Sequence, residues 1–157
     1  MRPVTSVNHA AVKSFRQLHR AKGRHAQQLF LLEGATSVSE ALRSQYPIDT
    51  IACTPRFQAK HPNLARSLCQ LPGLRTLLVT PDVLAKMAST ESLPDDGIVA
   101  SCPLRHVGDA RSCTQAPVGI EVALQNPQDP GNFGTMLRNA AASGYLTLCL
   151  PLTSSPL

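Results

Sequence analysis

The chain has 157 residues, enough for one ordinary domain or for one small domain and part of another. Hydrophobic residues make up 43% of it, which can supply a core, but no apolar run approaches the roughly 18 to 20 residues of a membrane span. The five cysteines are widely spaced and never form a Cys-x-x-Cys pair, so we expect reduced thiols in a cytoplasmic protein and no metal site. A membrane-spanning protein and a disulfide-stabilised secreted domain are therefore excluded.

The formal net charge of +5 is concentrated at the N-terminus. All basic residues before Glu33 lack an acidic counterpart in that segment, namely Arg2, Lys13, Arg16, Arg20, Lys22 and Arg24. We expect residues 1–28 to form a basic arm containing an amphipathic helix over 10–21, with Phe15 and Leu18 on its apolar side. Such an arm favours a polyanionic partner, although a merely solvated basic face or an organelle transit peptide would have a similar composition.

Strand and helix patterns alternate from residue 29 to residue 103. Strands are expected at 29–32, 48–54, 75–80 and 97–102, and helices at 37–42, at 62–71 and from 81 onward. Ser37 and Glu40 have the spacing of a capping box, and Thr80 with the following proline has the pattern of another helix start. The alternation predicts a small α/β domain over 29–103.

A second unit is expected after a proline-bounded linker at 104–117. Within 118–157 the pattern predicts a strand at 118–124, a loop, a helix and a strand at 145–150. The loop carries Gly131, Asn132 and Gly134 where the helix begins, and Asn132 is suited to cap that helix. This spacing fits neither a dinucleotide-binding fingerprint nor a P-loop.

Arg138 lies one helical turn beyond Gly134. Helical side chains lean toward the N-terminus, so its guanidinium is expected to reach back over the glycine toward the loop. A planar cation at the positive end of a helix suits a phosphate group. The alternative, a structural ion pair between Arg138 and Asp129, stays open on the residues alone.

The segment NPQDPGNFGTMLRNAAASG closely resembles the first signature motif of the SpoU (TrmH-type) RNA ribose methyltransferases of the SPOUT superfamily. Upstream, LHRAKGRHAQQLFLLEGATSVSEAL, VTPDVLAKMASTES and GIVAS resemble the substrate-binding domain of that family, including its short EG and TES sequences. The resemblance implies an α/β fold, in which a small RNA-substrate-binding domain precedes the first β-α-β portion of a trefoil-knotted methyltransferase domain. It also implies S-adenosylmethionine as methyl donor, a ribose 2′-hydroxyl of tRNA or rRNA as acceptor, and a homodimeric full-length protein.

The resemblance also assigns roles to individual residues. Arg138 matches the catalytic arginine of the family and Asn132 the asparagine of the motif, while Asn126 and Gly134 are expected to shape the RNA side of the pocket. Because a guanidinium is a poor base, orientation of an RNA phosphate is the role we favour for Arg138. Affinity for the RNA backbone is assigned to the basic arm, through Lys13, Arg16, Arg20, Lys22 and Arg24.

The second and third motifs of the family, which build most of the cofactor pocket and of the dimer interface, are expected beyond residue 157. The sequence is therefore interpreted as a fragment, frameshifted or split member of the family that is inactive by itself. Two other hypotheses remain from the sequence: a non-catalytic RNA-binding module, and an unrelated phosphate-binding α/β protein.

Overall fold

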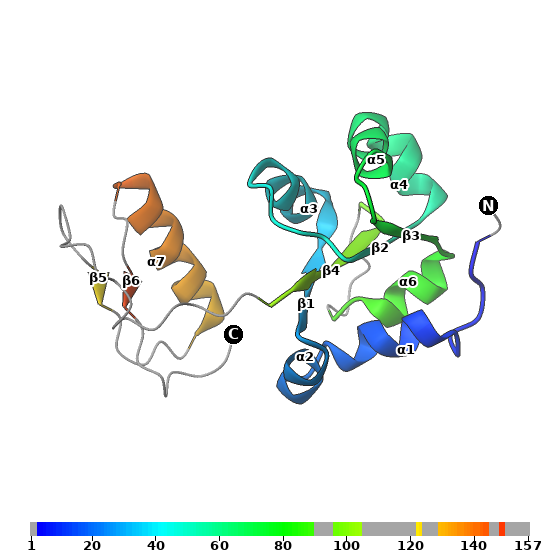
Figure 1. Ribbon diagram of the computed structural model, residues 1–157, viewed down its shortest axis with the longest axis horizontal. Helices are drawn as coiled ribbons and strands as arrows, with labels where there is room; N and C mark the ends of the chain where they lie inside the picture. The colour runs from blue at the N-terminus through cyan, green and yellow to red at the C-terminus, as the bar shows by residue number, and fades with distance from the viewer. Residues whose placement is uncertain (1–2, 90–95, 105–121, 124–128, 145–147, 150–157) are drawn as a thin grey trace. The chain divides into compact units, whose positions relative to one another are not determined.

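The computed structural model describes residues 3–89, 96–104, 122–123, 129–144 and 148–149 (Figure 1). The chain divides into two compact units, Met1–Arg105 and His106–Leu157, and each is described here by itself. Within the described residues, no helix is both long and apolar enough to cross a membrane.

The N-terminal unit is built around a mixed four-stranded sheet. Its elements are α1 (Ala10–Gln17), α2 (Ala21–Gln27), β1 (Leu29–Glu33), α3 (Gly34–Arg43), β2 (Thr50–Cys53), α4 (Pro55–Lys60), α5 (Pro62–Cys69), β3 (Arg75–Leu78), α6 (Pro81–Met87) and β4 (Ile98–Pro103). The strand order is β1-β4-β2-β3, with β4 antiparallel to both of its neighbours and β2 parallel to β3. Strands β1, β2 and β3 therefore run in the same direction, opposite to β4. The expected α/β fold is confirmed.

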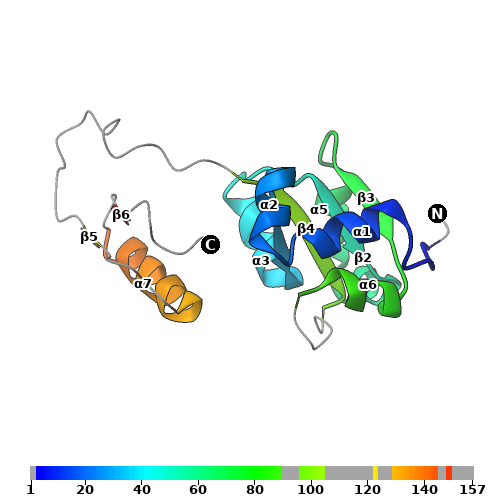
Figure 2. The same ribbon diagram turned by 90° about the horizontal axis from the view of Figure 1, so that it is seen from below.

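Helices cover both faces of this sheet (Figure 2). Successive residues of a strand point to opposite faces, so Ala52 and Val99 pack in one core with α1 and α6. Ile51 and Ile98 pack in the other core with α3, α4 and α5. Because both faces are covered, the central strands β2 and β4 are buried almost throughout, which explains why they read as continuous apolar runs.

The single helix expected over residues 10–21 is broken into α1 and α2. A Cβ atom on Gly23 would lie 1.9 Å from the carbonyl oxygen of Gln17, so only glycine lets the backbone of α2 approach the end of α1 this closely. Val12, Phe15 and Leu18 are all buried. The apolar side of α1 is thus part of the core.

Helix α3 begins at Gly34, three residues before the expected start at Ser37. The capping box is therefore wrong: Ser37 and Glu40 both lie inside the helix. Gly34 has a φ of 85°, a left-handed conformation that suits glycine and that lets the chain turn directly from β1 into α3.

Helix α4 was not expected from the sequence. Its start is fixed by Thr54, whose Oγ1 accepts a hydrogen bond from the backbone N–H of Phe57 at 3.3 Å, and by the proline that follows. The same Thr-Pro pattern at Thr80 correctly marked the start of α6, where the threonine side chain makes no capping bond.

The described part of the C-terminal unit contains β5 (Val122–Ala123), α7 (Pro130–Ala142) and β6 (Leu148–Cys149). Strands β5 and β6 are parallel and α7 connects them, which is the β-α-β arrangement expected from the sequence. Phe133 is buried, whereas Leu137, one turn later on α7, is 38% exposed. The described strands are two residues long and can cover little of a helix of 13 residues.

Candidate functional site

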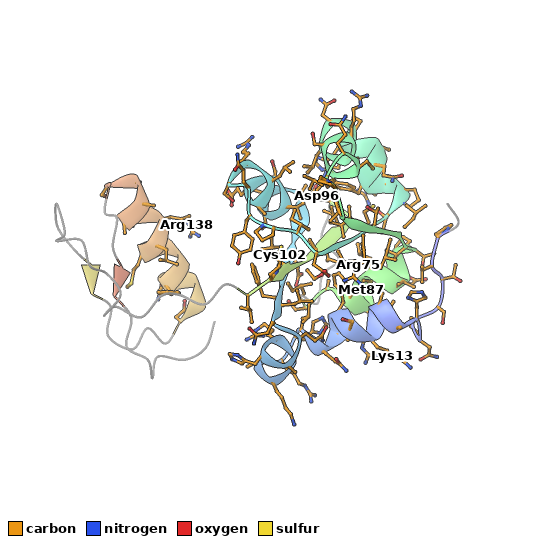
Figure 3. The ribbon with its side chains drawn as sticks, in the orientation of Figure 1. Lys13, Arg75, Met87, Asp96, Cys102 and Arg138 are labelled. Atoms are coloured by element: carbon orange, nitrogen blue, oxygen red, sulfur yellow. The ribbon has the colours of Figure 1, made fainter. Side chains whose placement is uncertain are left out.

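Four basic side chains on the α1–α2 hairpin form what we call the cationic surface. They are Lys13, Arg16, Arg20 and Lys22, and all four are exposed (Figure 3 labels Lys13). The ion pairs found within the described residues join Lys60 and His61 to Asp96, and Arg75 to Asp49, and none involves the cationic surface. Its charge is therefore available to an anionic partner in solution.

Side-chain hydrogen bonds hold the two helices of the hairpin together. The Ser14 hydroxyl donates to Oε1 of Gln27 at 2.5 Å. Nε2 of Gln27 donates in turn to the carbonyl oxygen of Ser14 at 3.2 Å and to Oε1 of Gln17 at 3.0 Å. His19 fastens the hairpin to α6, because its Nε2 lies 2.9 Å from the carbonyl oxygen of Met87. The cationic surface is therefore carried by two helices that are bonded to each other and to the rest of the N-terminal unit, and not by a free arm.

Arg24 differs from the other basic residues of this segment. Its side chain is only half-exposed, and Nη1 donates to the carbonyl oxygens of Leu18 at 3.2 Å and of His19 at 3.4 Å. A cation at the C-terminal end of a helix satisfies carbonyl groups that have no partner within the helix. Arg24 therefore stabilises the turn between α1 and α2, and any contact with RNA would compete with these bonds.

The loop-to-helix motif of the C-terminal unit is capped by Asp129. Its Oδ1 accepts a hydrogen bond from the backbone N–H of Asn132 at 2.7 Å, and Pro130 occupies the first position of α7. The expectation that Asn132 caps the helix is wrong, because the helix begins two residues earlier and places Asn132 in its first turn. The side chain of Asn132 is exposed. Asn126, the other asparagine of the motif, lies outside the described residues.

Arg138 folds back over Gly134, as its position one turn later predicts (Figure 3 labels Arg138). Its Nη1 lies 3.3 Å from the place where a Cβ atom on Gly134 would stand. Its Nη2 donates to Oγ1 of Thr135 at 3.0 Å, and the Thr135 hydroxyl donates to the carbonyl oxygen of Gly131 at 3.0 Å. In the described part of α7, Arg138 is thus held by Thr135 and forms no ion pair with Asp129.

Sequence reasoning missed Thr135 as the residue that orients Arg138. The available signal was the spacing, since residues three apart on a helix are neighbours. The exposed guanidinium lies over Gly134, in the second turn of α7, where the absence of a side chain leaves it room to fold back toward the N-terminal end of the helix. This arrangement can bind a phosphate group.

Asp96 forms the centre of a separate charged cluster (labelled in Figure 3). Its Oδ1 accepts from Nζ of Lys60 at 2.6 Å and lies 3.1 Å from Nε2 of His61. The hydrogen bond from Lys60, followed by that from His61, lowers the pKa of Asp96 to about 2. These contacts connect the end of α4 to the segment before β4, so Lys60 has a structural partner.

Two cysteines of the N-terminal unit are buried, Cys53 and Cys102. Burial raises the pKa of each thiol to about 11, so both stay protonated near neutral pH and are poor nucleophiles. Among the residues that the structure describes, no three His, Cys, Asp or Glu side chains are grouped so that they could hold a metal ion.

A family model described as the MRM3-like substrate-binding domain matches residues 9–100, more than half of the chain. The chain belongs to this family. The match begins beside α1 and ends within β4, so the MRM3-like domain includes the whole α1–α2 hairpin and its cationic surface.

Curated relatives are RNA methyltransferases. An uncharacterized tRNA/rRNA methyltransferase of Synechocystis is 39% identical over 141 residues, covering 90% of this chain and 49% of the relative. The 23S rRNA (guanosine(2553)-2′-O)-methyltransferase RlmP of Bacillus subtilis is 27% identical over 144 residues, covering 92% and 52%. The chain therefore spans about half the length of the curated relatives that it matches.

Solved structures give the same result. The AdoMet-bound rRNA methyltransferase of Sinorhizobium meliloti matches with a TM-score of 0.78 and 27% identity, covering 99% of this chain and 56% of that one. The SpoU methyltransferase AviRb of Streptomyces viridochromogenes shares the fold, with a TM-score of 0.76 at 21% identity over 95% of this chain and 55% of its own. The resemblance to the SpoU family is confirmed.

Proposed function

We propose that this chain supplies the RNA-binding part of a cytoplasmic, S-adenosylmethionine-dependent RNA 2′-O-ribose methyltransferase of the SpoU type that modifies tRNA or rRNA. The observation that carries the proposal is the cationic surface. It lies on the α1–α2 hairpin, whose helices are hydrogen-bonded to each other, inside a substrate-binding domain. Lysine and arginine side chains that neutralise phosphates supply most of the sequence-independent affinity for RNA. The RNA methyltransferases among the relatives support the same reading.

The N-terminal part of α7, from Asn132 to Arg138, is proposed to hold the reacting nucleotide. A ribose hydroxyl is a poor nucleophile, so its position relative to the methyl donor must be fixed. Arg138, held by Thr135, would bind an RNA phosphate near Asn132, with Gly134 and Asn126 shaping the pocket. Because a guanidinium is a poor base, Arg138 positions the nucleotide and leaves proton removal to another group.

S-adenosylmethionine and the second subunit are proposed to contact residues outside this sequence. The AdoMet-bound relative from Sinorhizobium meliloti is covered by the chain over 56% of its length, which leaves room for such residues in the remainder. A homodimer is the assembly that we expect for full-length proteins of the family. A non-catalytic RNA-binding module is the second candidate, and it is favoured by the self-contained core of the N-terminal unit, in which helices cover both faces of the sheet.

The proposed RNA binding can be tested by fluorescence anisotropy with a labelled single-stranded RNA at several salt concentrations. Replacing Lys13, Arg16 and Arg20 by glutamine should flatten the plot of log Kd against log salt by roughly two units, since each contact with single-stranded RNA contributes about 0.7. The matched control replaces Arg43, Arg56 and Arg66, which are exposed on α3, α4 and α5. Equal effects of both triple variants would argue against the cationic surface as the RNA site.

A further inference from the structure

The N-terminal unit contains a cavity of about 570 Å³ to which the proposed function assigns no role. It lies on the face of the sheet that α1 and α6 cover, at the strand ends that carry Thr50 and Arg75. Helix α6 follows β3 and packs at the other end of the strands, through Val79 and Val83, so this end of the face is left open beside α1. The volume is typical of small-molecule and nucleotide sites.

Apolar side chains form the walls of the cavity. Phe15 contributes from α1, Leu29 from β1 and Leu77 from β3. Leu29 and Leu77 are half-buried, so each still presents apolar surface. Walls of this kind suit the faces of a flat heterocycle, which gain free energy when they leave water.

Polar groups converge at one side of the cavity around Asp49. Its Oδ2 accepts hydrogen bonds from the Thr50 hydroxyl at 2.7 Å, from Nη2 of Arg75 at 2.6 Å and from the Ser101 hydroxyl at 3.3 Å. Its Oδ1 accepts from Nη2 of Arg75 at 2.8 Å, the one bond to this atom among the described residues. A carboxylate oxygen can accept two hydrogen bonds, so Oδ1 has capacity for a further donor.

Asp49 is also held in its ionised form. Burial raises the pKa of its carboxyl, but hydrogen bonds from Thr50 and Arg75 and the charge of Arg75 outweigh burial, so the pKa is lowered. Arg75 also lines the cavity, and its side chain is 69% exposed. Lys13 of the cationic surface lies on the same helix as the cavity-lining residues Ala11 and Ser14, but it does not itself line the cavity. Arg75 is therefore the cation at the mouth of the cavity that a phosphate of a bound RNA strand can reach.

We propose that the cavity binds one unpaired RNA base that carries an exocyclic amine, with the amine donating to Oδ1 of Asp49 and the ring between Phe15, Leu29 and Leu77. This proposal rests on the proposed RNA binding and adds a base-selective subsite to it. Adenine, cytosine and guanine carry such an amine, whereas uracil presents its N–H between two carbonyl oxygens, which a carboxylate repels. The exposed Arg75 at the mouth can contact an adjacent phosphate.

The test compares eight-nucleotide uridine oligomers with oligomers of the same length that hold a single central adenosine, cytidine or guanosine. All have the same phosphate charge, so any difference in affinity comes from the central base. We expect about five- to tenfold tighter binding of the amine-bearing oligomers, at the lower end of what a well-made base contact contributes. Asp49→Leu, which removes both acceptor oxygens, should bring this ratio to within twofold of one while leaving the affinity for oligouridine within twofold, with its melting curve recorded to confirm folding.

A variant that fills the cavity provides the second arm. Ala11→Phe places a ring in the cavity from α1, and Ala26→Phe is the matched control, since Ala26 is exposed on α2 and does not line the cavity. The base preference should disappear in the first variant and persist in the second, with both melting curves recorded to confirm folding. Salt-dependent binding of every oligomer with no preference would overturn the base subsite and leave the proposed function intact. No binding of any oligomer at low salt would overturn both.

Discussion

The carboxylate of Glu33 accepts a hydrogen bond from the backbone N–H of Ser89 at 2.8 Å and another from the Ser89 hydroxyl. Glu33 ends β1, and Ser89 follows α6. Glu33 is the glutamate of the EG sequence, and Ser89 directly precedes the TES sequence, 56 residues after Glu33. The hydrogen bonds give a physical reason for the glutamate of EG, because it fixes the end of α6 beside the strand that precedes the glycine.

Removing this contact should destabilise the N-terminal unit. Glu33→Ala leaves the backbone N–H of Ser89 without its charged acceptor, and we expect a loss of about 1–2 kcal/mol in the free energy of unfolding, measured in urea. Glu40→Ala is the control, because Glu40 is exposed on α3. Equal losses in the two variants would mean that the Glu33–Ser89 contact contributes nothing specific.

Deletion of residues 1–28 tests where the folded domain begins. Sequence reasoning set its start at residue 29, and the burial of Val12, Phe15 and Leu18 now favours a start before α1. Each of these side chains contributes about 1.5–3 kcal/mol by leaving water, against a typical domain stability of about 5–15 kcal/mol. We expect the fragment 1–105 to unfold cooperatively by circular dichroism and the fragment 29–103 not to do so. Equal cooperativity would return the boundary to residue 29.

The acid stability of the N-terminal unit should depend on Asp96. Its pKa is lowered from 3.8 to about 2 in the folded protein. A carboxyl with a lowered folded pKa stabilises the fold above its unfolded pKa, and this contribution is lost as the pH falls through the folded value. The melting temperature should therefore fall between about pH 4 and pH 2, and less steeply in Asp96→Asn. Asp49 shifts in the same direction, so part of the slope will persist. An Asp96→Asn profile identical to that of the parent chain would show that the Lys60–Asp96–His61 cluster is not maintained in solution.

The strands and the position of Arg138 over Gly134 could be predicted from the sequence because their signals are local. Apolar runs such as that of β4 mark strands buried on both faces, and helical geometry alone places Arg138 over Gly134. What the sequence could not supply depends on contacts between distant residues. Arg24 reaches the carbonyl oxygens at the end of α1 because α2 approaches α1 closely at Gly23. No sequence pattern marks either residue for this role. The cavity at Asp49 likewise exists only because several strands and α1 meet there.

The final prediction concerns methyl transfer. With labelled S-adenosylmethionine and tRNA or rRNA, we expect no transfer by the chain as given, because the cofactor-binding residues are proposed to lie outside it and a cofactor pocket needs walls on several sides. Fusion to the uncovered half of a relative such as RlmP should produce activity if the methyltransferase proposal is right. Robust transfer by the 157-residue chain would contradict that assignment of the cofactor site.

In the active fusion, Thr135 and Arg138 should be separable by kinetics. Arg138→Lys keeps the charge but loses the planar pair of donors, so kcat should fall severely, by about 100-fold if the nucleotide is displaced by an ångström. Thr135→Val removes the hydroxyl that holds Nη2 of Arg138 but leaves the guanidinium itself. It should therefore lower kcat by a smaller factor with little change in KM for RNA, and Thr135→Ser, which keeps the hydroxyl, should restore most of the loss. If Thr135→Val raised KM with kcat unchanged, Thr135 would contribute to binding alone, and near-normal turnover by Arg138→Lys would remove Arg138 from the mechanism.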